Sequence, residues 1–378
     1  MTLNTFLNSN LTTKKENVSI TIVSNGITLD QWEDISVDRS LNSLSASFSV
    51  SLIDKWRQRR LAYFLKPGVQ IALKIGADPI LIGYIDTLDV SITNSDRQIS
   101  ISGRDLTGDL VDSSAESTPS EFKNITVESL SRSLLKPYQL ALVVETPATK
   151  PFEKFSVKEG ESVFEVLERA AKARGLLLLS RFDGSLVLKR PDYKNTESLS
   201  TLTQGVNVTS ASASYTSTER FSNYTVKSQT NATGAGKKKQ ATEITATAED
   251  AGVSRYRPKT IIAESSLDAD GCRQRVQWEA SVRAARSIDA NVSVQGWRTS
   301  SGELWDIGKV VNVDIGFIGV QSKKMLISTV SYSKTLGGGT TSTLGLTRVD
   351  AFESSETIAE SIELDLGWDQ STFKNLGL

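Results

Sequence analysis

The chain has 378 residues, with 43 lysines and arginines against 44 aspartates and glutamates, so its formal net charge is −1. A balance this even excludes bulk electrostatic attraction to nucleic acid or to an anionic membrane. The sequence has no histidine and one cysteine, Cys272. These absences exclude the usual general base, the commonest metal ligand, an intrachain disulfide and a cysteine zinc site.

Residues 1–112 are predicted to form a first β-barrel-like domain. Asn25-Gly26 is a typical hairpin turn between short alternating segments. Residues 44–52 keep a period of two, which places Leu44, Ala46, Phe48, Val50 and Leu52 on one face of a sheet. Several such strands at short spacing favour a barrel or a sandwich.

Residues 113–192 are predicted to form a small α+β insert domain. One helix is expected where Val127, Leu130 and Leu134 follow helical spacing before Pro137. Ser162 and Glu165 have the spacing of a capping box at the start of a second helix. A hairpin with Asp183-Gly184 as its turn is expected to follow.

Residues 193–350 are predicted to hold linker strands, a helix over 267–288 and a second β-barrel-like domain. The C-terminal tail, residues 351–378, carries acidic and apolar patches and is expected to dock on a partner or to fray. The fold class is therefore mainly β, with two barrel-like domains and an α+β insert.

Two distant segments share one β pattern. Each starts at a glycine, Gly68 or Gly308, and continues as an apolar strand, a turn, a second strand, a polar turn and a third strand that ends with Arg and Asp. The pattern predicts two similar modules in one chain. A trimer would present six near-equivalent modules around one axis, which could join a six-fold object to a three-fold one.

Two basic segments are candidate contacts with a lumen or a partner. Arg57, Arg59 and Arg60 follow Trp56, a combination that could touch nucleic acid but is more typical of an ordinary surface or interface. Lys237, Lys238 and Lys239 follow Gly234-Ala235-Gly236, which lacks the spacing of a phosphate-binding loop and is more typical of a solvated hairpin tip.

Other candidate sites are weaker. The run 268–271 lacks the twelfth acidic ligand of a calcium loop, and carboxylate pairs such as Asp86 with Asp89 or Glu303 with Asp306 are expected by chance among so many acids. Trp297 and Trp305 flank a turn and are expected to serve barrel packing or a subunit interface, a role also predicted for Arg104 and Asp105. No catalytic residue, cofactor site or metal site is predicted.

The chain resembles the baseplate hub proteins, tail proteins of about 43 kDa, of Mu-like contractile phages and prophages. The resemblance covers most of the length and rests on the order and spacing of several motifs: 83–86, 103–105, 109–112, 169–175, 221–227, 255–258, 261–265, 296–297 and 302–305. Such hubs are similar to the hub of phage T4 and to the N-terminal part of type VI secretion spike proteins.

The resemblance implies a homotrimeric ring of barrel-like domains, with the six-fold tail tube on one face and the three-fold spike on the other. It implies contacts with the spike or puncturing protein, tail tube or distal tail proteins and the tape-measure protein, and DNA only in transit through the lumen. The expected location is the virion tail baseplate. The alternatives are a tail-associated enzyme that degrades peptidoglycan and a saccharide-binding β module.

The N-terminus has neither a basic start nor a long apolar core, so no signal peptide is predicted. The longest plain apolar run, 176–179, is far shorter than the roughly 20 residues of a membrane helix. We therefore expect synthesis in the cytoplasm of the host bacterium and no stable membrane insertion.

Overall fold

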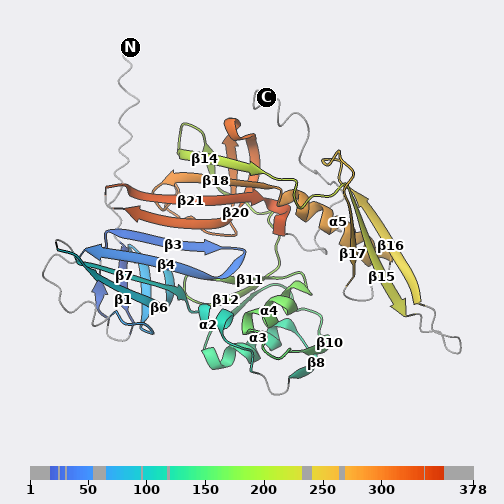
Figure 1. Cartoon of the computed structure of the whole chain (residues 1–378), viewed down its shortest axis with the longest axis horizontal. Helices are drawn as coiled ribbons and strands as arrows, with labels where there is room; N and C mark the ends of the chain where they lie inside the picture. Colours follow the sequence, from blue (N-terminus) through green and yellow to red (C-terminus); the bar gives the residue numbers. More distant parts are fainter. Residues whose placement is uncertain are drawn as a thin grey trace, which may run out of the picture.

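The computed structural model describes residues 18–23, 26–29, 32–53, 65–94, 97–116, 120–231, 241–263, 269–335 and 337–352. The chain is mostly β; its shorter α-helices lie together at the bottom of Figure 1, and one longer helix lies at the right. The strands are β1 Val18–Ile22, β2 Thr28–Leu29, β3 Asp34–Ser40, β4 Ser43–Ile53, β5 Gln70–Ile75, β6 Asp78–Ile92, β7 Arg97–Asp105, β8 Glu121–Ile125, β9 Leu142–Glu145, β10 Phe152–Ser156, β11 Leu177–Ser180, β12 Leu186–Lys189, β13 Ser198–Thr203, β14 Val208–Tyr215, β15 Asn223–Asn231, β16 Ala241–Glu249, β17 Pro258–Ile262, β18 Ile288–Gln295, β19 Val310–Ile315, β20 Val320–Thr335 and β21 Gly339–Arg348. The α-helices are α2 Gly108–Asp112, α3 Val127–Leu135, α4 Val163–Lys172 and α5 Ala269–Ala285, and the 3-10 helices are η1 Lys136–Tyr138, η2 Gly316–Ile318 and η3 Val349–Phe352.

Two sets of strands have the same spatial order and the same connectivity. In module 1 the neighbours run β3-β4-β7-β6-β5-β1, with β2 beside β1, and in module 2 they run β14-β18-β21-β20-β19-β13. The chain visits the corresponding positions in the same sequence in both modules. The predicted pair of similar β modules is thus present.

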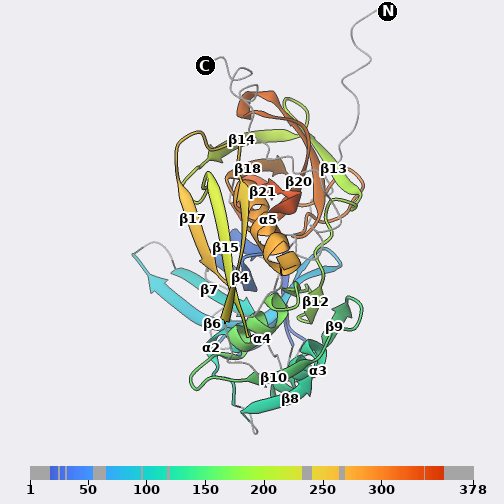
Figure 2. The ribbon, with the colours of Figure 1, turned by 90° about the vertical axis from the view of Figure 1, so that its right-hand side faces the viewer.

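The modules differ in two respects. β1 runs antiparallel to β5, whereas β13 runs parallel to β19. In module 2 an arm is inserted between β14 and β18; it consists of the sheet β16-β15-β17 and α5, which packs against β15 and β16 (Figure 2). Module 1 makes the corresponding connection with a turn at Leu41 and Asn42.

The modules are not closed barrels within the described residues. Instead, β3 of module 1 pairs with β20 of module 2, so one sheet passes through both modules. Its main core is also shared, since buried side chains such as Ile20 and Phe48 belong to the same cluster as Val292 and Tyr332. The sheet forms because alternation puts Leu44, Ala46, Phe48 and Val50 on one face, where they are buried as expected.

The α+β part follows module 1. The α3 and α4 helices pack on the small sheet β11-β12-β9, around a core that includes Leu130, Leu134, Val166 and Leu167. The capping box predicted for α4 is present, because Ser162 Oγ accepts from the Glu165 amide and Glu165 accepts from the Ser162 amide. The chain division expected at residues 112, 192 and 350 stays a prediction.

The C-terminal end of α5 differs from the sequence expectation. A helix over 267–288 was expected; its first two positions lie outside the described residues, α5 ends at Ala285, and Ile288 already begins β18. The reason is a tight turn in which Ser287 Oγ donates to the Ala284 carbonyl at 2.6 Å, competing with continued helical hydrogen bonding. No helix in the described part of the chain is long and apolar enough to span a membrane.

The capping box yields a stability prediction. Ser162→Ala removes the acceptor for the Glu165 amide, so we expect the free energy of unfolding to fall by about 1 kcal/mol. Chemical denaturation followed by helical circular dichroism measures it. The exposed Glu159→Ala in the preceding turn is the control and should change stability by less than about 0.5 kcal/mol; equal losses in both variants would contradict the capping role.

Candidate assembly interface

The junction between the two modules is a strand ladder. β20 has 16 residues, and its first part pairs with β19 while its second part pairs with β3. The ladder with β3 runs from Thr329 opposite Ser40 to Lys334 opposite Ile35. Module 1 therefore supplies the strand that covers the edge of module 2.

A hairpin of module 2, residues 296–306, rests on module 1. Arg298 forms an ion pair with Asp78 at 2.6 Å and donates to the Ile75 carbonyl at 3.3 Å, so it holds the turn between β5 and β6. On its inner side, the hydroxyl of Tyr332 donates to the Trp305 carbonyl. The hairpin thereby fastens the β5–β6 turn of module 1 to β20 of module 2.

Arg39 of β3 links three parts of the fold. Its Nη1 donates to Asp306 Oδ1 at 2.7 Å in module 2, and its Nη2 donates to the Ser180 carbonyl at 2.6 Å in β11 of the α+β part. Its guanidinium also lies 4.0 Å from the centre of the Phe182 ring. Because its side chain is only 3% exposed, these partners replace water for a buried charge.

Burial acts on the carboxylate of this pair as well. Loss of water around Asp306 raises the pKa of its carboxyl group above the usual range, while the charge of Arg39 and the Ile307 amide act in the opposite direction. The ion pair is therefore costly to break, because removal of either partner leaves the charge of the other with little access to water.

Removal of Arg39 should loosen all three parts at once. We expect Arg39→Ala to lower the free energy of unfolding by roughly 3–5 kcal/mol, because it removes the positive charge from Asp306, which keeps the Ile307 amide, and the guanidinium donor from the Ser180 carbonyl. Arg39→Lys should recover only part of this loss, since an ammonium lacks the planar fork that reaches both acceptors. Urea denaturation measures both variants.

The exposed ion pair of Lys227 with Glu243 supplies the matched control. Lys227→Ala should cost at most about 1 kcal/mol. An Arg39→Ala loss as small as this would contradict the linking role.

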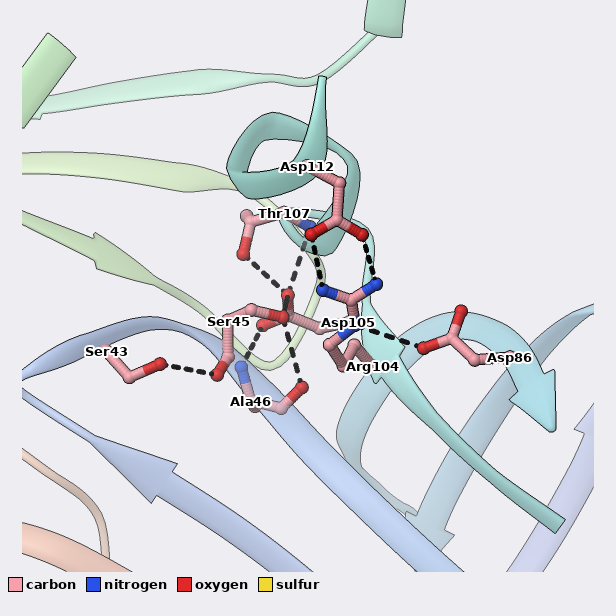
Figure 3. Close-up of polar contacts among 8 residues, drawn as sticks. All are labelled: Ser43, Ser45, Ala46, Asp86, Arg104, Asp105, Thr107 and Asp112. Atoms are coloured by element: carbon pink, nitrogen blue, oxygen red, sulfur yellow. Dashed lines mark hydrogen bonds and ion pairs between the residues drawn. The ribbon is translucent and has the colours of Figure 1, made fainter. Parts of the chain in front are cut away.

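A second polar cluster lies where β7 leads into α2 (Figure 3). Arg104 Nε donates to Asp86 at 3.0 Å, and its two terminal nitrogens hold both oxygens of Asp112. The Arg104 guanidinium lowers the pKa of Asp112 below its usual range, and the two carboxylates raise the pKa of Arg104. This bidentate pair fixes α2 against the end of β7, and the bond to Asp86 ties both to the middle of β6.

Asp105 points to the other side of β7 and is buried. Its oxygens accept from the Ala46 amide and the Ser45 hydroxyl, both at 3.0 Å, and from the Thr107 amide and hydroxyl at 3.0 and 2.6 Å. One carboxylate therefore satisfies β4 and the turn before α2 together.

Two glycines allow β6 and β7 to approach closely beside this cluster. A Cβ on Gly83 would lie 1.9 Å from the Arg104 carbonyl oxygen, and one on Gly103 would lie 2.0 Å from the Tyr84 carbonyl oxygen. Backbone atoms cannot yield to such an overlap, so no other residue fits without a shift of the strands.

The Arg104 cluster gives a pH prediction. Since the folded pKa of Asp112 is lowered, its contribution to stability is present above its unfolded pKa and is lost as the pH falls through the folded pKa. In Arg104→Ala we expect the pKa of Asp112 to return toward its ordinary value, and NMR titration of the carboxyl group measures it. An unchanged Asp112 pKa in this variant would contradict the assignment.

The structure separates the predicted site residues. Trp297 and Trp305 are 2% and 3% exposed and pack in the main core, with Trp297 Nε1 donating to the Ser333 carbonyl at 3.1 Å. Both tryptophans therefore serve core packing in this chain. A subunit-interface role for Trp297, Trp305, Arg104 and Asp105 stays a prediction. Arg57, Arg59, Arg60, Lys237, Lys238 and Lys239 lie outside the described residues.

The Arg and Asp endings of the two blocks are not equivalent. Arg104 pairs with Asp86 and Asp112, whereas Arg348 pairs with Asp350. Arg348 lies opposite Met325 of β20, and Asp105 lies opposite Gly83 of β6. Met325 and Gly83 each come two residues before the isoleucine after which the register shifts, so Arg348 occupies the position of Asp105. The Arg and Asp residues that end the two sequence blocks therefore do not occupy equivalent positions in the structure.

The glycines that start the two blocks are equivalent. Gly68 and Gly308 both have positive φ, +85° and +72°, a conformation that favours glycine. The Gly68 amide donates to the Ile85 carbonyl at 2.7 Å, and the Gly308 amide donates to the Ile327 carbonyl at 2.9 Å. The Ile85 amide donates back to the Val69 carbonyl at 3.0 Å, and the Ile327 amide donates back to the Lys309 carbonyl at 2.8 Å.

A bulge follows at the same place in both modules. The register between β6 and β7 shifts after Ile85, leaving Asp86 extra, and the register between β20 and β21 shifts after Ile327, leaving Ser328 extra. Matching glycines, hydrogen bonds and bulges show that β6 corresponds to β20 residue by residue.

Comparison with known proteins relates the chain to phage baseplate proteins. Three family models match: a Mu phage baseplate assembly protein, N-terminal domain, at residues 18–105; a baseplate hub protein, second domain, at residues 107–190; and a Mu phage baseplate assembly protein, fourth domain, at residues 268–355. The baseplate hub protein of Escherichia phage Mu is 32% identical over 320 residues, which is 83% of each chain.

Solved structures agree with this relationship. The 43 kDa tail protein of prophage MuSo2 from Shewanella oneidensis superposes with a TM-score of 0.78 at 31% identity, over 90% of this chain and 100% of that one. A type VI secretion component of E. coli, described as structurally similar to T4 tail proteins, shares the fold at a TM-score of 0.55 and 10% identity, over 86% and 75%. On the extent of its identity with the phage Mu protein, the chain belongs to the baseplate hub proteins of Mu-like contractile-tailed phages.

Proposed function

We propose that this hub protein assembles as a homotrimeric ring with pseudo-six-fold symmetry, which adapts the six-fold tail tube to the three-fold spike. The observation that carries the proposal is the duplicated module: both copies have the same strand order and connectivity, and they join edge to edge through β3 and β20. Three chains then present six similar modules, whereas a single-module chain would need six copies.

The proposed partners follow from this role. The ring contacts tail tube or distal tail proteins on one face and the spike or puncturing protein on the other. The tape-measure protein and then DNA pass through its central channel. Arg57, Arg59, Arg60 and the Lys237–Lys239 segment stay candidate contacts with the lumen or a partner, and the tail at residues 351–378 stays a candidate docking segment. Synthesis takes place in the host cytoplasm before incorporation into the baseplate.

A non-enzymatic role is supported by the relatives, which are structural baseplate proteins. The enzyme alternative needs a pair of carboxyl groups that flank the scissile bond of a substrate. Of the pairs considered from the sequence, Asp86 is bound by Arg104 and Asp306 by Arg39. Hydrolysis of purified peptidoglycan that is abolished by one carboxylate substitution would support that alternative, and glycan binding by the isolated chain would support the saccharide-binding one.

The ring has a direct test. Light scattering of the purified protein should give three times the mass of the single chain, and the hub complex released from tails should contain three copies of it. An image down the particle axis should show six lobes in a three-chain ring. A monomer that persists at high concentration and in the released complex would contradict the proposal.

A further inference from the structure

One edge of module 2 is covered and its counterpart in module 1 is open. Residues 329–334 of β20 pair with β21 on one side and β3 on the other. The corresponding residues of β6, 87–92, pair with β7 on one side. Within the residues that the structure describes, no strand pairs with their other side.

The exposure of the side chains follows this difference. Tyr332 of β20 is 1% exposed, whereas Val90 at the corresponding position of β6 is 61% exposed and Ile92 is 70% exposed. Two large apolar side chains on an open strand edge are atypical of a surface that stays in water. In module 2 the equivalent edge, residues 329–334 of β20, is covered by an antiparallel strand, β3.

A second open edge belongs to β14, which lies at one end of the same sheet. β14 holds the position in module 2 that β3 holds in module 1, and among the described strands it ends the sheet by pairing with β18; an isolated bridge to Gln204 involves only its first residue, Val208. Ala211 and Ala213 alternate with exposed serines, and their half-buried side chains pack on the main core. In module 1 the equivalent strand, β3, is the one that covers β20.

We propose that β14 of one subunit pairs antiparallel with residues 87–92 of β6 in the next subunit, repeating between chains the β3–β20 ladder found within each chain. This inference deepens the proposed ring and rests on it. The partner is a second copy of this chain, and the same ladder then links all modules of the ring.

The register follows from the internal copy. Val37 of β3 lies opposite Phe48 of β4, and Ala213 of β14 lies opposite Ala290 of β18. Phe48 and Ala290 occupy equivalent positions in the two modules, so Ala213 is the counterpart of Val37. Val37 also lies opposite Tyr332, whose counterpart in β6 is Val90.

Val90 therefore lies opposite Ala213 of the neighbouring subunit, and Ile92 lies opposite Ala211. Ser91 then lies opposite Ser212. Apolar residues meet on one face and serines on the other, as sheet pairing across an interface requires.

Both edges carry few of the features that protect strand edges from association, since the register shifts at Asp86 and between Val208 and Ser210 lie outside the residues that would pair. β14 has no proline and no charged residue, and residues 87–92 have one charge, Asp89. Edges of this length and composition are templates for pairing. Since the two edges belong to different strands, with β14 drawn near the top and β6 near the bottom of the shared sheet in Figure 1, the contact is heterologous rather than two-fold, and it closes at three copies in the proposed ring.

Disulfide cross-linking tests the register. Directly opposed positions have Cβ atoms within disulfide reach, whereas positions two residues apart do not. Val90→Cys and Ala213→Cys are introduced together into the full chain, and tails assembled with it are oxidised and run on a denaturing gel without reductant. We expect covalent trimers. The pair Val90→Cys with Ala211→Cys is the off-register control, and the parent chain, whose single Cys272 is buried, should give no cross-link.

Mixed assemblies test the heterologous contact. Each single variant alone should give no cross-link, and a mixture of the two should give dimers. A cross-link in Val90→Cys alone would indicate pairing between two β6 edges and overturn the proposal. Equal cross-linking of the off-register pair would overturn the register.

Failure of the ladder and failure of the ring are distinguishable. If light scattering shows a trimer but the Val90→Cys, Ala213→Cys chain gives no cross-link, the strand pairing is wrong and the proposed hub ring stands. If the released complex contains no trimer, the proposed ring itself is wrong.

Discussion

The ladder between β3 and β20 makes one sheet from two modules, and the rest of the molecule is arranged around it. An uncovered strand edge exposes backbone donors and acceptors that need partners. Within each chain, β20 finds them in β3, and the 296–306 hairpin reinforces the contact through Arg298 and Asp78. Arg39 then ties the same strand to the α+β part through Ser180. The relative placement of all three parts therefore depends on β3.

The two modules keep what the backbone requires and differ where side chains decide. Both retain the starting glycine, the returning isoleucine hydrogen bonds and the bulge after them. Their polar clusters differ, since Arg104 holds α2 through Asp112 whereas Arg348 holds Asp350 within η3. Backbone geometry in the repeat is thus more similar than the interactions that each module makes with its surroundings.

The sequence predicts local features well. Alternation in residues 44–51, the capping box at Ser162 and the two glycine-led blocks are all present in the structure, because each follows from patterns of neighbouring residues or of strands that succeed one another in the chain. The length of β20 and its change of partner from β19 to β3 depend on pairing across more than 280 residues, which no local pattern specifies.

The polar links were missed for a related reason. Arg39 continues the alternation of Ile35 and Val37, so an arginine on the apolar face of a strand was a visible signal of a buried charge. Its partners, Asp306 and Ser180, come from distant segments and could not be named from spacing. Trp297 and Trp305 were easier, because large aromatic residues beside a turn are usually buried.

The arm formed by β15–β17 and α5 has a counting consequence. It occupies the connection between β14 and β18, where module 1 has only the turn at Leu41 and Asn42. Any assembly of this chain consequently bears half as many arms as modules. A binding protein that contacts only the modules finds two equivalent sites per chain, whereas a binding protein that contacts the arms finds one.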